Sequence, residues 1–160
     1  MIIFINGSCN SGKSTITKLL SEKLGNTAKL EIDDVRAMID WMPLEQSIPI
    51  NLQNAISLIK NFSSNSLNVV IPYPLSQKNY EHIMNQLKDV NTKIHHFTLA
   101  PRLEKILTNR TGQRELDDWE RNRIKYHYEI GLHKPSFGEI IDNSDLTPEE
   151  TTNYIISKIK

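Results

Sequence analysis

The chain has 160 residues, 38% of them hydrophobic, and its 19 basic and 19 acidic side chains give a formal net charge of zero. This is the composition of a soluble globular protein, and a chain of this length can bury a real core as one domain. The charge balance argues against nucleic acid as the main partner, because proteins that bind it usually carry a basic excess. The single cysteine, Cys9, excludes an intramolecular disulfide.

Nothing in the sequence predicts contact with a membrane. No stretch approaches the ~18–20 apolar residues that a membrane span requires. The apolar start has neither a basic segment nor a long apolar run, so it is not expected to be a signal peptide. We therefore expect a cytoplasmic protein; its oligomeric state is not predicted.

Apolar runs alternate with amphipathic segments from the start of the chain. Residues 1–5 are apolar, rich in β-branched side chains and followed by Asn6 and Gly7, which predicts a buried strand. Residues 14–24 carry apolar side chains at helical spacing and end at Gly25. The next expected elements are a strand at 28–32, a helix at 35–41, a loop with two prolines at 42–49, an amphipathic helix at 50–62 and a strand at 67–71.

The same alternation continues to the end of the sequence. The expected elements are a helix at 77–87, a strand at 94–99, a helix with Pro101 at its first position, a polar segment at 111–116, a helix at 117–130 and a strand at 139–142. Thr147-Pro148-Glu149-Glu150 predicts the start of a last helix, which ends near Ile159, because it combines a capping box with proline at the first helical position. Strands that alternate with helices predict an α/β fold with a parallel sheet.

One motif points directly to chemistry. Residues 7–14 read GSCNSGKS and fit the pattern G-x-x-x-x-G-K-[S/T] of a P-loop, between an apolar strand and an amphipathic helix. The glycines let successive N–H groups turn inward around an anion, and the helix adds the positive end of its dipole. Lys13 is expected to reach the β- and γ-phosphates of ATP, and the Ser14 hydroxyl is expected to bind Mg²⁺. The predicted nucleotide-binding residues are Gly7, Ser8, Cys9, Asn10, Ser11, Gly12, Lys13, Ser14 and Thr15.

Alternatives to this interpretation can be named. The segment could be an ordinary turn with a solvated lysine, but the strand before it and the helix after it favour the P-loop. Within the loop, Cys9 is either a small spacer or a thiol made reactive by the nearby helix N-terminus. The sequence lacks the N-K-x-D and D-x-x-G motifs of switch GTPases and the L-S-G-G-Q motif of transport ATPases.

The early P-loop and the order of elements resemble the nucleoside-monophosphate-kinase and shikimate-kinase superfamily, over the whole chain. The resemblance implies a three-layer P-loop fold, with a five-stranded parallel sheet, helices on both faces and a short lid. It also implies that residues 1–160 form a single kinase domain, with the lid at about 111–130.

Residues 31–36, EIDDVR, follow the second expected strand and resemble the D-D-x-R segment of polynucleotide 5′-kinases. A similar acid occurs in chloramphenicol-phosphotransferase-like enzymes. The resemblance implies that Asp33 takes the proton from the attacking hydroxyl and that Arg36 contacts an anionic part of the substrate. The position of Asp33 after a strand agrees with this role, because ligands of open parallel sheets bind beyond the carboxyl ends of the strands. The alternative is that Asp33 or Asp34 caps the following helix.

Residues 110–118, RTGQRELDD, resemble the lid of nucleoside monophosphate kinases. The resemblance implies that Arg110 and Arg114 bind the phosphates during transfer, a role that suits the planar and permanently charged guanidinium group. Arg121 and Arg123 follow on the next helix, where a solvated face is the alternative.

The sequence also departs from these families. The third strand ends Val70-Ile71-Pro72-Tyr73-Pro74, without the aspartate and arginine of nucleoside monophosphate kinases, and no triple glycine of shikimate kinases follows it. No Walker B acid is present there, which leaves Asp33 or Asp34 for that magnesium contact. Overall, the chain resembles chloramphenicol-phosphotransferase-like and tunicamycin-resistance-like small kinases.

The sequence therefore predicts an ATP- and Mg²⁺-dependent phosphotransferase that moves the γ-phosphoryl group to a hydroxyl of a small molecule. The alternatives are a shikimate-kinase-like or nucleotide kinase, a nucleic-acid 5′-kinase module, and a switch that hydrolyses ATP slowly or not at all. His95 and His96 are adjacent in a strand and so point to opposite faces, which predicts structural roles. Trp119, Tyr126 and Tyr128 could line an acceptor pocket, although packing of their helix is favoured.

Overall fold

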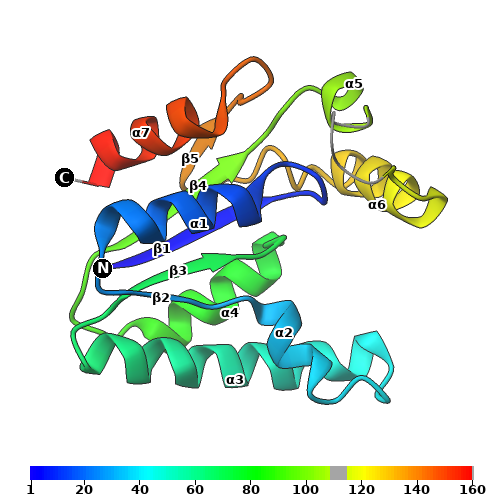
Figure 1. Ribbon diagram of the computed structural model, residues 1–160. Coiled ribbons are helices and arrows are strands. Elements are labelled where there is room, and N and C mark those ends of the chain that lie inside the picture. The colour runs from blue at the N-terminus through cyan, green and yellow to red at the C-terminus, as the bar shows by residue number, and fades with distance from the viewer. Residues whose placement is uncertain (109–114, 160) are drawn as a thin grey trace.

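Residues 1–108 and 115–159 are described by the computed structural model, and five parallel strands in this part of the chain form one sheet (Figure 1). The strands are β1 (Ile2–Gly7), β2 (Thr27–Lys29), β3 (Asn68–Pro72), β4 (Ile94–Leu99) and β5 (Glu139–Ile141). Their order in the sheet is β2-β3-β1-β4-β5, so the strand that leads into the P-loop is the central one. The predicted α/β fold with a five-stranded parallel sheet is confirmed.

Helices cover both faces of the sheet. They are α1 (Lys13–Leu24), α2 (Ile32–Ala37), α3 (Leu44–Ser64), α4 (Gln77–Leu87), α5 (Leu103–Ile106), α6 (Asp118–Glu129) and α7 (Pro148–Ile159). In Figure 1, α1 and α7 lie on one side of the sheet, and α3 and α4 lie on the other. In the described part of the chain, no helix is long and apolar enough to span a membrane.

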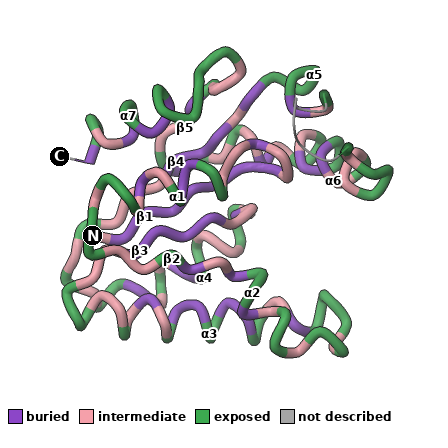
Figure 2. The backbone as a smooth tube through the Cα atoms, viewed as in Figure 1, coloured by how far each residue is buried: buried purple, intermediate pink, exposed green. Residues whose placement is uncertain are grey.

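The core explains why β1 is apolar at every position. Ile2 and Phe4 pack in one cluster with α3 and α4, whereas Ile3 and Ile5 pack in a second cluster with α1 and α7. A strand that is buried on both faces needs a continuous apolar run instead of an alternating one. Figure 2 shows β1 buried along its whole length between its two neighbours.

Three predicted boundaries were wrong, and prolines account for two of them. Helix α3 begins at Leu44, so most of the predicted loop at 42–49 is helical, and Pro49 lies inside the helix. Pro43 is its N-cap, and the Pro43 carbonyl accepts hydrogen bonds from the N–H groups of Gln46 and Ser47. Proline fits the start of a helix because the first N–H groups have no partner there. Pro101 does not occupy the first helical position, since α5 begins at Leu103.

The third boundary lies between β2 and α2. Strand β2 ends at Lys29, two residues before the helix N-cap at Glu31. Ile32, which was predicted to end the strand, is therefore the first residue of the helix. Ile32 and Val35 are both buried in the cluster with α3, and their spacing of three places them on one helical face. Burial of that face explains why the helix starts before the predicted residue 35.

Candidate active site

The loops that follow the five strands meet at one edge of the sheet, because parallel strands all end at the same edge (Figure 1). The P-loop follows β1. Asp33 follows β2, Tyr73 follows β3, Pro101 follows β4 and Asn143 follows β5. The fold therefore brings together segments that are far apart in the sequence.

Two glycines give the P-loop its shape. Gly7 has φ +145°, and a Cβ atom there would lie 2.6 Å from Ser11 Oγ and 2.8 Å from the Leu99 carbonyl oxygen. Gly12 is the N-cap of α1 and has the left-handed value φ 97°. Any other residue would collide at the first position and be strained at the second. The loop can therefore wrap its N–H groups around an anion.

The Lys13 side chain folds across this loop. Lys13 Nζ donates a hydrogen bond to the Ser8 carbonyl oxygen at 2.7 Å. Burial lowers the pKa of Lys13, and the nearby Cys9, Asp33 and Glu31 oppose that shift. Ser14 and Thr15, in the first turn of α1, are exposed beside it. The positions of these side chains are compatible with the phosphate and Mg²⁺ contacts that the motif predicts.

Asp33 lies within the first turn of α2, and the N-cap of this helix is Glu31. The alternative that Asp33 or Asp34 caps the helix is therefore wrong. Asp33 Oδ1 is 3.9 Å from Arg36 Nε, and its side chain is 74% exposed, so its carboxylate is free to meet a substrate.

Sequence reasoning did not select Glu31, although it lies in the segment that suggested Asp33. Its pKa is raised, mainly by burial and then by Asp34, while Lys13 acts in the opposite direction. The mutual influence of Glu31 and Lys13 shows that a second acid lies near the P-loop lysine. Glu31 therefore joins Asp33 and Asp34 as a candidate for the magnesium contact that β3 does not supply.

A cavity of about 380 Å³ lies beside the P-loop, at the ends of β2 and β3. We call it the β3-side cavity. Three of its lining residues, Cys9, Asp33 and Arg36, belong to the predicted site. The others come from separate elements: Ile32, Leu44, Ile48, Asn51, Tyr73, Pro74, Trp119, Arg123 and His127. Of these, sequence reasoning had considered only Trp119 as a pocket residue.

The three aromatic side chains of α6 that the sequence singled out have different surroundings. Trp119 is 65% exposed and lines the β3-side cavity. Tyr128 instead donates a hydrogen bond to the Pro101 carbonyl and stacks on His133, with ring centroids 4.2 Å apart. Tyr126 lies under the Arg123 guanidinium, whose carbon is 5.6 Å from the ring centroid. The favoured packing role is therefore correct for Tyr128, whereas Trp119 faces the cavity.

His127 connects α6 to the P-loop. Its Nδ1 lies 2.9 Å from Ser8 Oγ, and both residues are buried. Burial, with smaller effects of Arg123 and Lys13, lowers the pKa of His127 to about 4, so the imidazole is neutral at pH 7. Among the residues that the structure describes, no three or more His, Cys, Asp or Glu side chains are grouped so that they could hold a metal ion by themselves.

A second cavity, of about 320 Å³, lies on the other side of the P-loop and is called the β5-side cavity. Its walls come from the start of α1, from α5 and from the loop between β5 and α7. It is lined by Gly12, Thr15, Ile16, Pro101, Lys105, Thr108, Asn143, Ser144, Leu146, Pro148 and Thr151. Asn143 Nδ2 donates to the Ser11 carbonyl at 3.0 Å and so joins this wall to the P-loop.

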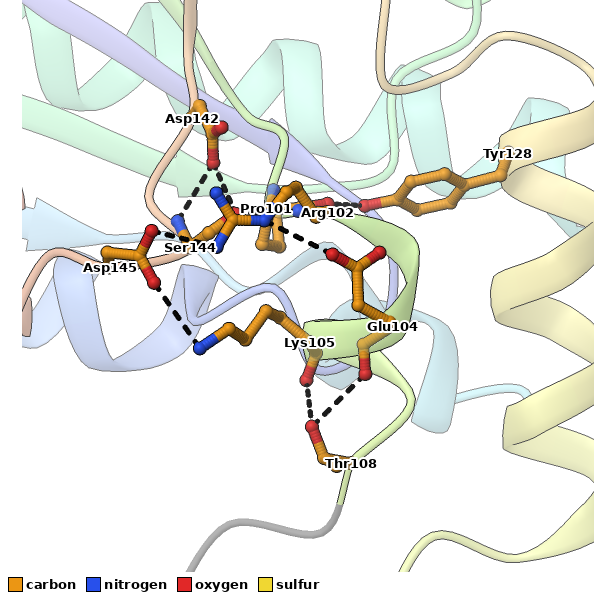
Figure 3. A network of polar contacts seen from close by, with 9 residues as sticks. All are labelled: Pro101, Arg102, Glu104, Lys105, Thr108, Tyr128, Asp142, Ser144 and Asp145. Carbon is orange, nitrogen blue, oxygen red and sulfur yellow. Dashed lines mark hydrogen bonds and ion pairs between the residues drawn. The ribbon is translucent and has the colours of Figure 1, made fainter.

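Polar contacts hold two walls of the β5-side cavity together (Figure 3). Arg102 Nη2 lies 2.7 Å from Asp145 Oδ2, and the Arg102 N–H donates to Ser144 Oγ at 2.7 Å. Lys105 Nζ is 3.3 Å from the other Asp145 oxygen. Single exposed ion pairs stabilise little, but this set fixes the loop after β5 against α5. The cavity is thus framed by connected segments.

The other arginines that the sequence singled out differ in their positions and contacts. Arg110 and Arg114, the predicted lid arginines, lie outside the described residues. Arg121 donates from Nη1 to the Leu107 carbonyl at 2.9 Å, which attaches α6 to the segment after α5. Arg123 lines the β3-side cavity, so its side chain does more than form a solvated face.

Comparisons with known proteins agree with the fold. No model of a protein family matches the chain. The chain is 33% identical over 166 residues to a Sulfurisphaera tokodaii protein described as "Putative adenylate kinase", and the alignment covers 98% of this chain and 81% of that protein. The tunicamycin resistance protein of Deinococcus radiodurans has a similar structure, with a TM-score of 0.73, 21% identity and coverage of 99% of this chain and 94% of that chain.

Shikimate kinase from Aquifex aeolicus vf5 is a further structural neighbour, with a TM-score of 0.60, 18% identity and coverage of 99% of this chain and 96% of that chain. The P-loop and the 33% identity to the Sulfurisphaera tokodaii protein, together with the shared sheet, define a protein of the kinase-like P-loop superfamily, a class of nucleotide-dependent phosphotransferases. Within this class, the chain belongs to the family of the Sulfurisphaera tokodaii protein, because a third of the residues are identical along nearly the whole chain.

Proposed function

We propose that this protein is an ATP- and Mg²⁺-dependent kinase that transfers the γ-phosphoryl group of ATP to a hydroxyl group of a small molecule. The observation that carries the proposal is the position of the P-loop between two cavities, with the Asp33 carboxylate at the wall of one of them. Phosphoryl transfer is an in-line displacement, so the donor and the acceptor must approach the phosphates from opposite sides. The two cavities supply those two sides.

On the donor side, the β5-side cavity would hold the nucleoside part of ATP, and the P-loop would hold its phosphates. Lys13 would place a positive charge at the β- and γ-phosphates, and the exposed Ser14 hydroxyl would bind the magnesium ion. When bound, Mg²⁺ neutralises charge that develops on the phosphate oxygens. Arg110 and Arg114 are proposed to contribute further positive charge during transfer.

On the acceptor side, Asp33 would orient the attacking hydroxyl and take its proton. Arg36 and Arg123 line the same cavity and would contact an anionic part of the acceptor. His127 is neutral at pH 7 and bonded to Ser8, so its role is to hold the loop and not to add charge. The whole chain would act as one domain in the cytoplasm.

The test is ADP formation with candidate acceptors: phosphorylated and unphosphorylated sugars, cyclic alcohols, nucleosides, AMP and 5′-hydroxyl oligonucleotides. Asp33→Asn should lower kcat by ~10²–10⁴-fold with little change in ATP binding, because asparagine can orient a hydroxyl but cannot accept its proton. Arg36→Ala should instead raise the acceptor KM.

Asp40→Asn is the matched control, since it removes an exposed carboxylate just beyond the same helix, outside the proposed site. Full activity of Asp33→Asn with a true acceptor would show that Asp33 is not the base. An ATPase rate that no acceptor increases would favour the switch alternative.

A nucleotide acceptor is a second candidate, because the Sulfurisphaera tokodaii relative is described as a putative adenylate kinase. Its acceptor atom would be a phosphate oxygen, which needs no general base. Phosphorylation of AMP at a rate that Asp33→Asn leaves unchanged would therefore favour this candidate over a hydroxyl acceptor.

A further inference from the structure

Asn51 lies on α3 and lines the β3-side cavity, with 2% of its surface exposed. Within the described part of the chain, neither its Nδ2 nor its Oδ1 has a hydrogen-bond partner. Buried amide groups are nearly always paired in folded proteins, because an unpaired one is destabilising. An unpaired amide at the wall of a cavity is therefore suited to a ligand that completes its hydrogen bonds.

Asn6 shows what this fold does with a buried asparagine that has a structural role. Asn6 is 1% exposed, and its Nδ2 donates to Thr98 Oγ1 at 3.1 Å. Its Oδ1 accepts from the N–H groups of Gly7 at 2.8 Å and of Leu75 at 2.7 Å. At nearly the same burial, both polar atoms of the Asn6 side chain are hydrogen-bonded, whereas neither polar atom of the Asn51 side chain is.

The surroundings of Asn51 indicate the shape of its ligand. Leu44, Ile48 and Asn51 are spaced by four and three residues on α3, so one face of the helix carries all three to the cavity. Tyr73 lines the same cavity, and burial, more than any other effect, raises the pKa of Tyr73, which keeps the phenol neutral. Asn51 is therefore a polar group on an otherwise apolar and aromatic wall, which suits a planar ring with a polar edge.

We propose that Asn51 selects the acceptor, an inference that rests on the proposed function. Its amide hydrogen-bonds a ring edge that carries a donor and an acceptor side by side, since an asparagine amide can pair with both at once. The ring lies against the α3 face and Tyr73, and the Asp33 carboxylate meets the reacting hydroxyl. An analogue that lacks one member of the pair leaves the buried amide unpaired again and is rejected.

The first test compares stabilities without any ligand. Asn51→Leu keeps the approximate volume and removes the unpaired amide, so its Tm should equal or exceed that of the wild type. Asn6→Leu is the matched control and should lower the Tm by several degrees, because it leaves three partners unpaired. A fall in Tm for Asn51→Leu as large as that for Asn6→Leu would overturn the proposal, because Asn51 would then have a structural partner.

The second test uses adenosine and purine riboside, two hydroxyl-bearing probes that differ only in the amine beside a ring nitrogen. Their dissociation constants are measured by calorimetry with an ATP analogue present. Wild-type protein should prefer adenosine by tenfold or more, and Asn51→Leu should lose this preference. Asn51→Asp keeps the side-chain size but removes the donor, so this variant should also lose the preference for adenosine. It provides the same test if Asn51→Leu is poorly folded.

Circular dichroism and thermal melting of both Asn51 variants, compared with the wild type, separate this role from a general folding defect. An equal preference in the wild type and the variants would overturn the proposal, and so would the failure of adenosine to bind the wild type. Neither result would contradict the kinase proposal, which ADP formation with the wider set of acceptors tests by itself.

Discussion

Substitution of Lys13 has the most clearly defined expected effect on activity, because the ammonium group of Lys13 is packed against the P-loop. Lys13→Ala should reduce turnover to the background of the assay, since the charge between the β- and γ-phosphates is lost. The fold should remain intact, because removal of a buried charge imposes no new desolvation cost. ADP formation and thermal melting measure the two effects.

Lys18→Ala is the control for this variant, because Lys18 is an exposed lysine on the same helix. It should have normal activity. Wild-type turnover and ATP affinity in Lys13→Ala would show that the interpretation of the motif is wrong.

His96 is expected to make stability depend on pH. Its ring stacks on Phe4 with centroids 4.8 Å apart, and its two nitrogens have no partner among the described residues. Burial and the adjacent His95 lower the pKa of His96 to about 4. The unfolded chain, with a histidine pKa of about 6.5, binds the proton more readily, so stability falls as the pH decreases from about 6.5 towards 4.

His96→Phe should keep the stacking and remove this contribution. Between pH 7 and pH 5 the variant should lose about 2 kcal/mol less stability than the wild type, as measured by urea unfolding at both values. The remaining pH dependence belongs partly to His127, whose pKa is shifted in the same direction. Equal losses in the two proteins would show that His96 does not titrate as its burial implies.

The residues of the candidate site differ in how far the sequence reveals them. The P-loop is a run of neighbours whose spacing is itself the signal, and Asp33 and Arg36 follow one strand closely enough to be recognised. His127 and Asn51 have no such signal. His127 contacts Ser8, which lies 119 positions away in the sequence. Asn51 is recognised as a candidate only because its buried amide has no hydrogen-bond partner among the described residues. Contacts of this kind depend on tertiary packing, which local spacing does not encode.

At the scale of elements, α7 follows its local sequence. The Glu150 N–H donates to Thr147 Oγ1 at 3.2 Å, and the Thr147 N–H donates to the Glu150 carboxylate at 2.8 Å, so the predicted capping box is confirmed. Ile155 and Ile159 bury the other end of the helix in the core beside α1.

Thr147→Ala should therefore lower the free energy of unfolding by about 1 kcal/mol, because the cap satisfies an otherwise unpaired N–H group. Thr147→Ser, which keeps the hydroxyl, should cost much less. Urea unfolding of the two variants gives both numbers. Equal stability in Thr147→Ala and the wild type would show that the helix start is held by packing alone.

Helices α2 and α3 show where local signals fail. Two prolines at 42–49 predict a loop, yet Pro49 lies inside α3. Leu52, Ala55, Ile56 and Ile59 of this helix are buried against the sheet. Their burial, at roughly 25 cal/mol per Å² of apolar surface, outweighs the loss of one backbone hydrogen bond near the helix start. Tertiary packing, absent from any local pattern, decides such boundaries.

At the scale of the whole molecule, the alternation of strands and helices was enough to predict a parallel sheet, but not the order of its strands. That order puts β1 in the centre, with β3 and β2 on one side and β4 and β5 on the other. The two cavities beside the P-loop follow from it, because one opens near the ends of β2 and β3 and the other near the end of β5. The division of the proposed site into a donor side and an acceptor side is thus a property of the topology.

The central place of β1 also affects the biosynthesis of the protein. Ile2 is paired with Val69 on one side and with Ile94 on the other, so β1 is synthesised before both of its partner strands and cannot pair until they have been made. During that delay, an apolar, β-branched run is exposed to wrong pairing and to chaperones. Contacts of such long sequence separation form slowly. The P-loop, which follows β1, can therefore take its final shape only after β3 and β4 have been synthesised.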